Sequence, residues 1–366
     1  MMYKKLIALA VTAAVSAPAL ADSNVTVYGL AHVSVDSVKQ GAGVDALKVS
    51  SNVSKLGFKG SEDIGDGLSA IWQIEQQINI DNSTANVSTL ATRNSFAGLK
   101  SGAGTVLLGR HDTPYKIATR RLDVFGDYLA DNRTLMGGVA GKSVGSSFDG
   151  RPTDVLAYIT PDLGGFTGAI AYVAGAEGQT LAADKKGSAI SVAGMFNMAD
   201  FYGSLAYEEH TFGTAGTGTI AGAAALAGLK ESSAKLGLGY KIADALDLGV
   251  AYEKSTDNFG AANANKYGHN AAYVSAKYAF GAHALKLAYT KAGATATANT
   301  GATQISAAYE NSLSKRTSVY ALYTQLNNGS AANYNFATAG STAGGVATTG
   351  LGKNLSAISL GMKHSF

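Results

Sequence analysis

The sequence predicts an all-β chain, a transmembrane antiparallel β-barrel of sixteen strands. Three observations support this prediction: apolar and polar residues alternate along most of the chain, short turns alternate with long loops, and most aromatic residues near the strand ends are tyrosines. Charged residues make up 15% of the chain, which is low for a soluble domain. After the first 21 residues, no apolar run approaches the roughly 20 residues of a membrane-spanning helix, so a helical membrane protein is excluded.

Residues 1–21 have the features of a cleaved signal peptide. Lys4 and Lys5 form a basic start, residues 6–15 are apolar, and Ala19-Leu20-Ala21 supplies a small-residue cleavage site. The alternative, a transmembrane anchor, needs a longer apolar stretch. We therefore expect a signal peptide at 1–21 and a single barrel domain at 22–366. Without the two leader lysines the formal charge falls from +3 to +1, a balance that suggests no nucleic-acid partner.

Alternation with a period of two defines the candidate strands. In 68–75, for example, Leu68, Ala70, Trp72 and Ile74 lie on one face, and polar residues lie on the other. A soluble β-sandwich has the same local pattern, so alternation alone does not decide between the two. The sixteen candidate strands are 25–36, 51–59, 68–80, 92–100, 104–110, 153–160, 166–175, 188–199, 201–211, 232–241, 246–255, 271–280, 284–291, 302–311, 316–326 and 355–366.

Connection lengths favour the barrel. Short turns, such as 161–165 and 281–282, alternate with long loops rich in Gly, Asn, Thr and Ala. The long loops lie near 37–50, 111–152, 212–230, 257–270 and 327–353. Short turns at one rim and long loops at the other are typical of outer-membrane barrels. An even number of antiparallel strands also allows closure, which leaves no unpaired strand edge in hydrocarbon.

Aromatic side chains near the strand ends are expected to form a girdle at the level of the lipid headgroups. The candidates are Tyr28, Trp72, Tyr172, Tyr240, Tyr252, Tyr278, Tyr289, Tyr309 and Tyr323. Core tyrosines of a soluble β protein would explain any one of them, but not the whole set. In a barrel, Trp72, Leu236, Leu248 and Leu360 should face outward, and Lys59 and Glu75 should face the lumen.

Several motifs follow one another along the chain: VTVYG at 25–29, SKLGFKGSED at 54–63, GLSAIWQIE at 67–75, RNSFAGLK at 93–100 and GTVLLGR at 104–110, with Phe366 at the end. In this order they resemble the sixteen-stranded porins of Neisseria and its beta-proteobacterial relatives. The resemblance implies an outer-membrane homotrimer with one pore per subunit, through which ions and small hydrophilic solutes diffuse passively. It also implies contact with outer-membrane lipids and lipopolysaccharide, and recognition of Phe366 by the barrel-assembly machinery.

The resemblance further implies that the third long loop, His111 to about Gly150, folds inward and narrows the pore. The candidate constriction residues are Lys55, Glu75, Arg93, Arg110, Asp112, Arg120, Arg121, Asp123, Asp127 and Arg133. Acidic loop residues opposite basic wall residues would set up a transverse field. A solvated external loop is the alternative.

Lys55 stands where the family usually has an arginine, and Arg93 matches a second basic position. A third basic residue usually precedes the tyrosine after the loop, but here Ala157 precedes Tyr158. Arg110, Arg133 and Arg151 are candidates to replace that missing charge.

No group of residues suggests catalysis. The sequence has no Cys, and its six His lie on separate segments without the spacing of a metal site. We therefore expect no enzymatic activity, no cofactor and no metal. Two classes of function remain: a general diffusion pore, and a barrel that serves mainly as a structural or adhesive surface protein.

Overall fold

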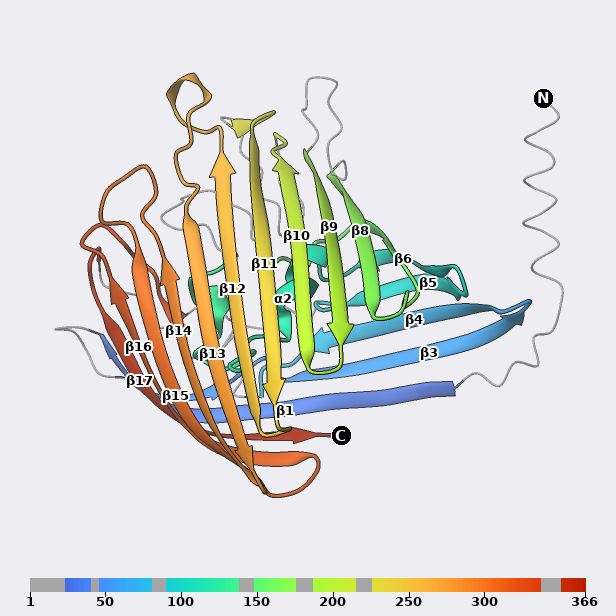
Figure 1. Ribbon diagram of the computed structural model, residues 1–366, viewed down its shortest axis with the longest axis horizontal. Coiled ribbons are helices and arrows are strands. Elements are labelled where there is room, and N and C mark those ends of the chain that lie inside the picture. The colour runs from blue at the N-terminus through green and yellow to red at the C-terminus, as the bar shows by residue number, and fades with distance from the viewer. Residues whose placement is uncertain are drawn as a thin grey trace.

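The computed structural model describes residues 24–40, 46–80, 90–137, 148–175, 187–214, 226–336 and 350–366 (Figure 1). The predicted signal peptide, 1–21, lies outside these residues. The strands are β1 (Asn24–Gln40), β2 (Ala46–Ser51), β3 (Lys55–Gly65), β4 (Leu68–Gln77), β5 (Ser95–Ser101), β6 (Gly104–Arg110), β7 (Val155–Ile159), β8 (Phe166–Gly175), β9 (Gly187–Met198), β10 (Phe201–Thr211), β11 (Lys230–Ile242), β12 (Leu246–Asp257), β13 (Asn270–Phe280), β14 (His283–Ala292), β15 (Ala302–Ser312), β16 (Thr317–Asn328) and β17 (Leu355–Ser365). The described helices are α2 (Pro114–Arg120), η1 (Asn132–Thr134) and η3 (Ala261–Asn263). Among the described residues, no helix is long and apolar enough to cross a membrane.

The strands form one closed antiparallel barrel. Each strand pairs with its neighbours in sequence, and β17 pairs with β1 through Leu30↔Ser365 to Gln40↔Leu355. β2 and β3 both pair with the same edge of β1 and act as one strand, interrupted at residues 52–54. There Val53 has a positive φ of 58°, and the Ser54 hydroxyl donates to the His32 carbonyl, so the interrupted strand stays attached to β1. The predicted sixteen-stranded barrel is confirmed.

The first hairpin is longer than the sequence predicts. Residues 37–50 were expected to form a loop, but β1 continues to Gln40 and β2 begins at Ala46. The two strands pair from Val33↔Ser51 to Val38↔Ala46, with Asp36 opposite Lys48. Polar residues at inward positions, such as Lys48 and Ser50, give this segment the composition of a loop, which is why the prediction was wrong.

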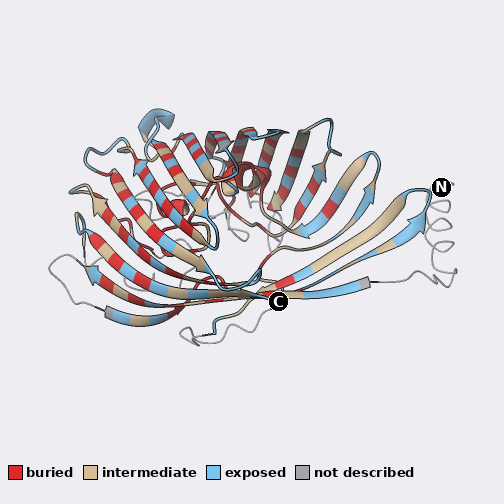
Figure 2. Cartoon of the chain, turned by 60° about the horizontal axis from the view of Figure 1, so that its bottom comes forward, coloured by how far each residue is buried: buried red, intermediate tan, exposed pale blue. Residues whose placement is uncertain are grey.

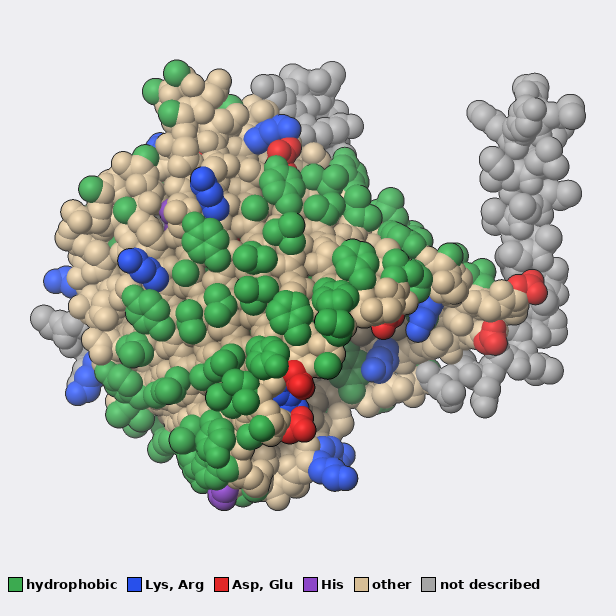
Figure 3. Space-filling model, viewed as in Figure 1, with side chains coloured by type: hydrophobic (Ala, Val, Ile, Leu, Met, Phe, Trp, Pro, Cys, Tyr) green, Lys and Arg blue, Asp and Glu red, His purple; other side chains and the backbone are tan. Residues whose placement is uncertain are grey.

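Buried and exposed residues alternate along most strands (Figure 2), and many of the exposed positions on the outer face are large apolar residues. Leu236, Leu248 and Leu360 are 45%, 39% and 57% exposed, as predicted. Trp72 lies on the same face as exposed Ile74 but is half-buried, because its indole covers Gly60. A broad hydrophobic belt crosses the front strands, with charged side chains above and below it (Figure 3).

Most members of the predicted aromatic girdle lie on the outer face of the barrel. The outward, exposed tyrosines are Tyr172, Tyr240, Tyr252, Tyr278, Tyr289, Tyr309 and Tyr323. Tyr28 is a correction, because its hydroxyl donates to Glu75 at 3.0 Å inside the barrel. The strand-end position of Tyr28 suggested the girdle, but its parity along β1 puts it on the same face as buried His32 and Ser34.

The loop between β6 and β7, residues 111–154, folds into the barrel and is called the inward loop below. Its described parts are 111–137 and 148–154. The helix α2 begins there because the Thr113 side chain accepts from the Lys116 N–H and Pro114 fits the first helical turn. Figure 1 shows α2 behind β10 and β11, inside the wall.

The middle of the inward loop packs against one side of the wall. Phe125, Leu129, Leu135 and Met136 are buried in a hydrophobic cluster with inward side chains of β12–β17. The cluster also includes Ala332, Tyr334 and Phe336, from the loop that follows β16. At the level of the inward loop, this side of the lumen is therefore filled by side chains.

The end of the chain completes the barrel at the short-turn rim. Phe366 and Gly29 exchange two backbone hydrogen bonds of 2.9 and 3.1 Å. The Phe366 ring lies over Gly29, where a Cβ atom would overlap it. The glycine in the VTVYG motif therefore makes room for the terminal aromatic ring.

Candidate functional site

Glu75 is the centre of a charged group on the barrel wall. It accepts from Arg93 at 2.5 Å and from Tyr28 at 3.0 Å, and Lys55 lies 3.7 Å from it. Tyr28 reaches Glu75 across Gly57, where a Cβ atom would overlap the Tyr28 ring. Glu75 and Arg93 are both buried. One carboxylate with two cations leaves this wall group with a net charge of +1.

A second charged group lies within the inward loop itself. Arg120 contacts Asp127 at 2.6 Å and Asp131 at 2.8 Å, and Arg133 contacts Asp131 at 2.8 Å. Burial alone would raise the pKa of Asp131. The charges of Arg120 and Arg133 instead hold this pKa well below its usual range. The acidic loop residues are thus paired mainly with basic residues of the same loop, and not with the wall.

A third group joins the two ends of the inward loop. Asp112 contacts Lys116 at 2.7 Å and Arg151 at 2.8 Å. Burial opposes ionisation of Asp112, but Lys116 and Arg151 hold its pKa well below the usual range. Burial lowers the pKa of Lys116 to about 8, against the opposing effect of Asp112. Asn94, next to Arg93 on the wall, also bonds Asp112 and Arg151.

These three groups line one cavity of about 390 Å³ between the inward loop and the wall at β3–β5, called the basic cavity below. Its charged lining residues are Lys55, Glu75, Arg93, Asp112, Lys116, Arg120, Asp127, Arg133 and Arg151. Six are basic and three are acidic. Asp123 and Asp131 lie behind Arg120, with fully buried side chains, so the cavity surface is more positive than the loop as a whole.

The inward loop is fixed to the wall at two places. On the α2 side, the Tyr115 hydroxyl donates to Glu253 at 3.0 Å and Tyr202 donates to the Ala118 carbonyl at 2.5 Å. On the far side, Tyr128 donates to Glu310 at 2.7 Å, and its ring meets those of His32 and Tyr320 edge-on. The loop therefore spans the lumen between two anchored ends.

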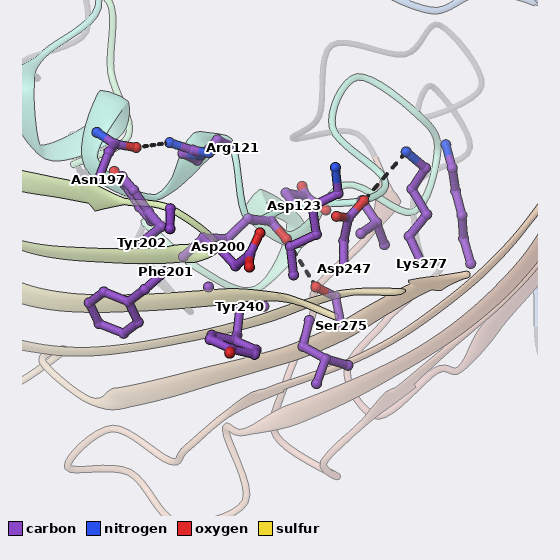
Figure 4. Close-up of a pocket in the computed structure, with 18 residues that line it drawn as sticks. Arg121, Asp123, Asn197, Asp200, Phe201, Tyr202, Tyr240, Asp247, Ser275 and Lys277 are labelled. Carbon is purple, nitrogen blue, oxygen red and sulfur yellow. Dashed lines mark hydrogen bonds and ion pairs between the residues drawn. The ribbon is translucent and has the colours of Figure 1, made fainter. Parts of the chain in front are cut away.

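A second cavity lies below the loop, towards the short turns (Figure 4). Arg121 lies there, bonded to Asn197 and stacked on Tyr202 at 4.3 Å. Asp123 accepts from Tyr273 at 2.9 Å, and burial together with the Asp131 charge raises the pKa of Asp123 to about 6. A third cavity, on the same side of the loop, is lined by Asp127, Glu310 and Lys363. Asp127 also lines the basic cavity.

The candidate residues from the sequence therefore separate into three sets. Those brought together in the basic cavity are Lys55, Glu75, Arg93, Asp112, Arg120, Asp127 and Arg133. Arg121 and Asp123 lie in the cavity below the loop. Arg110, at the end of β6 opposite Ser95, lines neither of these two cavities.

Two lining residues were missing from the list of candidates. Lys116 was overlooked because nothing in the sequence shows that α2 turns it towards Asp112. Arg151 was one of three possible replacements for the missing charge, and its position before β7 brings it to Asp112 from the far end of the loop. Of those three, Arg133 and Arg151 line the basic cavity and Arg110 does not.

Comparison with known proteins places this architecture in a family. A family model described as Gram-negative porin matches residues 8–331. The chain is 30% identical to outer membrane porin protein 32 of Delftia acidovorans, over the full length of both. It is 37% identical over 142 residues to the major outer membrane protein P.IB of Neisseria meningitidis serogroup B, covering 36% of this chain and 41% of the relative.

Among solved structures, the fold is similar to that of an anion-selective porin from Comamonas acidovorans. The TM-score is 0.74 at 25% identity, and the match covers 94% of this chain and 100% of the other. Members of this family are channels and not enzymes. The chain belongs to the Gram-negative porins, and it is an outer-membrane channel through which solutes diffuse passively.

Proposed function

We propose that the basic cavity is the selective section of the pore, and that it gives the channel a weak preference for anions. The observation that carries this proposal is the excess of lining cations, six against three acidic groups. The hydrophobic cluster around Phe125 fills the β12–β17 side at this level, which directs solutes past the basic cavity. Asp127 lines both this cavity and the one with Glu310 and Lys363 nearer the short-turn rim, which supports a solute path from one to the other.

A small number of fixed charges is sufficient for this effect. Charges in a narrow passage enclosed by protein act at a lower effective dielectric constant than charges in bulk water. The chain can therefore bias ion traffic although its overall charge is nearly neutral. The preference should be weak, because each lining acid is paired with a lining base and the positive excess is small.

The test is to replace Lys55 and Arg93 by Ser together, which changes the wall group from a net charge of +1 to −1. We expect the reversal potential in a salt gradient to shift towards cations, with conductance little reduced. A matched control is the double variant Lys254→Ser/Lys291→Ser, which removes the same charge from exposed positions on the outer face. An unchanged reversal potential in the Lys55/Arg93 variant would refute the proposed role of this wall group.

Deletion of the central part of the inward loop tests size selection separately. We expect larger solutes to enter the shortened variant, measured as swelling of proteoliposomes in sugars of increasing size. A structural or adhesive barrel, the alternative function, would show no solute-dependent swelling in either form.

We further propose that the mature chain begins after residue 21 and assembles as a homotrimer, through the strands near both chain ends. β1 and β17 are paired, so both ends contribute to one face of the barrel. Phe366, exposed at the short-turn rim, is the proposed signal for the barrel-assembly machinery. Outer-membrane lipids and lipopolysaccharide are the proposed surroundings. A species that remains monomeric in mild detergent at every concentration would contradict the trimer.

A further inference from the structure

The returning end of the inward loop, residues 148–154, begins on a histidine of the wall. The Phe148 ring stacks on the His210 ring of β10, with centroids 4.8 Å apart and an interplanar angle of 18°. Both side chains are buried. The Phe148 N–H also donates to the Gly137 carbonyl at 3.0 Å, which joins the two described parts of the loop. His210 is therefore the wall group that one face of the Phe148 ring rests on.

The His210 ring lies between two carboxylates. Its Nε2 atom is 2.7 Å from Glu208, and its Nδ1 atom is 3.0 Å from Glu231. Glu208 lies two residues earlier on β10, and Glu231 is the register partner of His210 on β11. Both glutamates are buried, and the Oε2 atom of Glu208 has no hydrogen-bond partner among the described residues. The contact with His210 is thus the one that compensates the Glu208 carboxylate in this part of the chain.

These contacts favour a doubly protonated ring. A neutral imidazole has only one N–H, so it can donate to one of the two carboxylates and not to both. The doubly protonated ring of His210 donates to both, and its charge offsets the repulsion between two carboxylates that are held close together away from water. A cation within about 6 Å of an aromatic centroid is also attracted to the ring face, which strengthens the contact with Phe148. Charge therefore fixes the ring on which the loop packs.

The attachment continues from Phe148 into the basic cavity. Asp149, the next residue, contacts the buried Lys235 of β11 at 2.7 Å. Arg151 follows three residues after Phe148, a span of at most roughly 11 Å along the chain. It contacts Asp112 at 2.8 Å and lines the basic cavity. Because the connecting segment is so short, a displacement of Phe148 would also move Arg151.

We propose that the doubly protonated His210 is a positioning residue of the pore: it holds the returning end of the inward loop through Phe148, and so keeps Arg151 in the basic cavity. His210 itself does not line that cavity. The consequence for ion selectivity rests on the proposed function of the basic cavity, whereas the attachment of the loop does not.

The first measurement is hydrogen exchange of the backbone amides of residues 148–154, by mass spectrometry on the purified, folded channel in detergent. His210→Phe keeps a ring against Phe148 but cannot donate to either carboxylate. We expect exchange about ten-fold faster than in the parent channel, since hydrogen bonds to charged groups are lost. A role in packing alone predicts no change, and unchanged exchange would overturn the proposal.

His269→Phe is the matched control. His269 is also buried, but its ring contacts the Tyr267 carbonyl, outside the inward loop. Exchange of residues 148–154 should stay at the parent rate in this variant. Equal acceleration by His269→Phe would show a general loosening of the barrel and would count against a specific role of His210.

A triple variant, Glu208→Gln/His210→Phe/Glu231→Gln, tests whether charge is the cause. It keeps the ring and removes both carboxylates, so no uncompensated charge remains, and exchange should return close to the parent rate. Equal acceleration in the single and triple variants would overturn the proposal. If His210→Phe alone does not form a barrel, the triple variant decides: a folded barrel with residues 148–154 protected supports the proposal, and an unfolded one overturns it.

The second measurement is the reversal potential in a salt gradient at pH 7. His210→Phe should shift it towards cations, as Arg151→Gln should, and the combined variant should shift it no further than Arg151→Gln alone. A shift that adds to that of Arg151→Gln would show that His210 does not act through Arg151. If Arg151→Gln leaves the reversal potential unchanged while His210→Phe still accelerates exchange, the proposed selectivity of the basic cavity fails and the positioning role of His210 stands.

Discussion

The two sides of the lumen are built from different residues. On the β12–β17 side, the inward wall positions include small residues such as Ala251, Ala271 and Ala288, and the aromatic residues of the inward loop pack directly against them. On the β3–β5 side, the inward wall positions carry Lys55, Glu75 and neighbouring polar groups. At its own level, the loop packs closely against the β12–β17 wall and leaves the basic cavity at the β3–β5 wall.

This difference shows how one loop both narrows the pore and leaves it open. Alanine on the wall gives the loop room to bury large side chains, and this burial is favourable by about 25 cal/mol for each Å² of apolar surface removed from water. Charged wall residues give no such gain, because burying them against the loop would cost their hydration. The position of the pore therefore follows from where the wall changes from small apolar to charged side chains.

The largest expected effect comes from opening the filled side. Phe125→Ala removes a fully buried ring from the cluster against Tyr273 and its neighbours. We expect a loss of about 3–5 kcal/mol in the free energy of unfolding, since a large buried side chain leaves a cavity. Because the loop loses its packing on this side, single-channel conductance should also rise and become noisier. Urea titration and planar-bilayer recordings measure the two effects.

Phe212→Ala is the matched control for this variant. Phe212 is also fully buried, but it packs against Phe259 at the long-loop rim, away from the inward loop. We expect a similar loss of stability and an unchanged conductance. If both variants change conductance equally, packing on the filled side does not set the width of the pore.

The sequence was sufficient to predict the barrel, because the alternation of Leu246, Leu248 and Val250 with polar neighbours is a local signal that every strand repeats. The prediction from sequence failed for residues 37–50, where polar residues at inward positions resemble a loop. It also failed for Tyr28, an aromatic residue near a strand end that faces inward. It could not show the filled side of the lumen. The burial of Phe125 and Leu129 depends on alanines in strands more than a hundred residues away, and such a contact has no local signature.

The second expected effect is at the far anchor of the loop. Tyr128→Phe keeps the ring against His32 and Tyr320 but removes the hydroxyl that donates to Glu310 at 2.7 Å. We expect a loss of about 1.5–3 kcal/mol in the free energy of unfolding, as for other hydrogen bonds to charged groups. Current fluctuations should increase without a large change in mean conductance, because the ring contacts remain.

Tyr334→Phe is the control for that variant. Tyr334 is buried in the same hydrophobic cluster, but its hydroxyl has no hydrogen-bond partner among the described residues. Its replacement should leave both stability and current noise nearly unchanged. Equal noise in the two variants would show that the bond between Tyr128 and Glu310 does not hold the loop.

The candidate site was predictable in part. The alternation of apolar and polar residues on the strands shows which side chains face the lumen. The lumen-facing positions of Lys55, Glu75 and Arg93 could therefore be inferred from their motifs. The pairing of Arg120 and Arg133 with acidic residues of the loop could not be predicted, because it depends on how the inward loop folds on itself. Arg110 is not among the residues that line the basic cavity, although its charge made it a candidate.

The smallest expected effect is a pH dependence on the charged side of the lumen. Burial lowers the pKa of Lys116 to about 8, whereas Asp112 stays ionised because its pKa is held well below the usual range. Lys116 is therefore charged at pH 7 and mostly neutral at pH 9, so the basic cavity loses one positive charge as the pH rises. We expect the reversal potential in a salt gradient to shift slightly towards cations over this interval. Lys116→Arg should abolish the shift, because arginine stays charged throughout, and Lys116→Met should show the alkaline value of the parent channel at both pH values. An identical shift in the parent channel and the Arg variant would assign the titration to another group and leave Lys116 with a purely structural role beside Asp112.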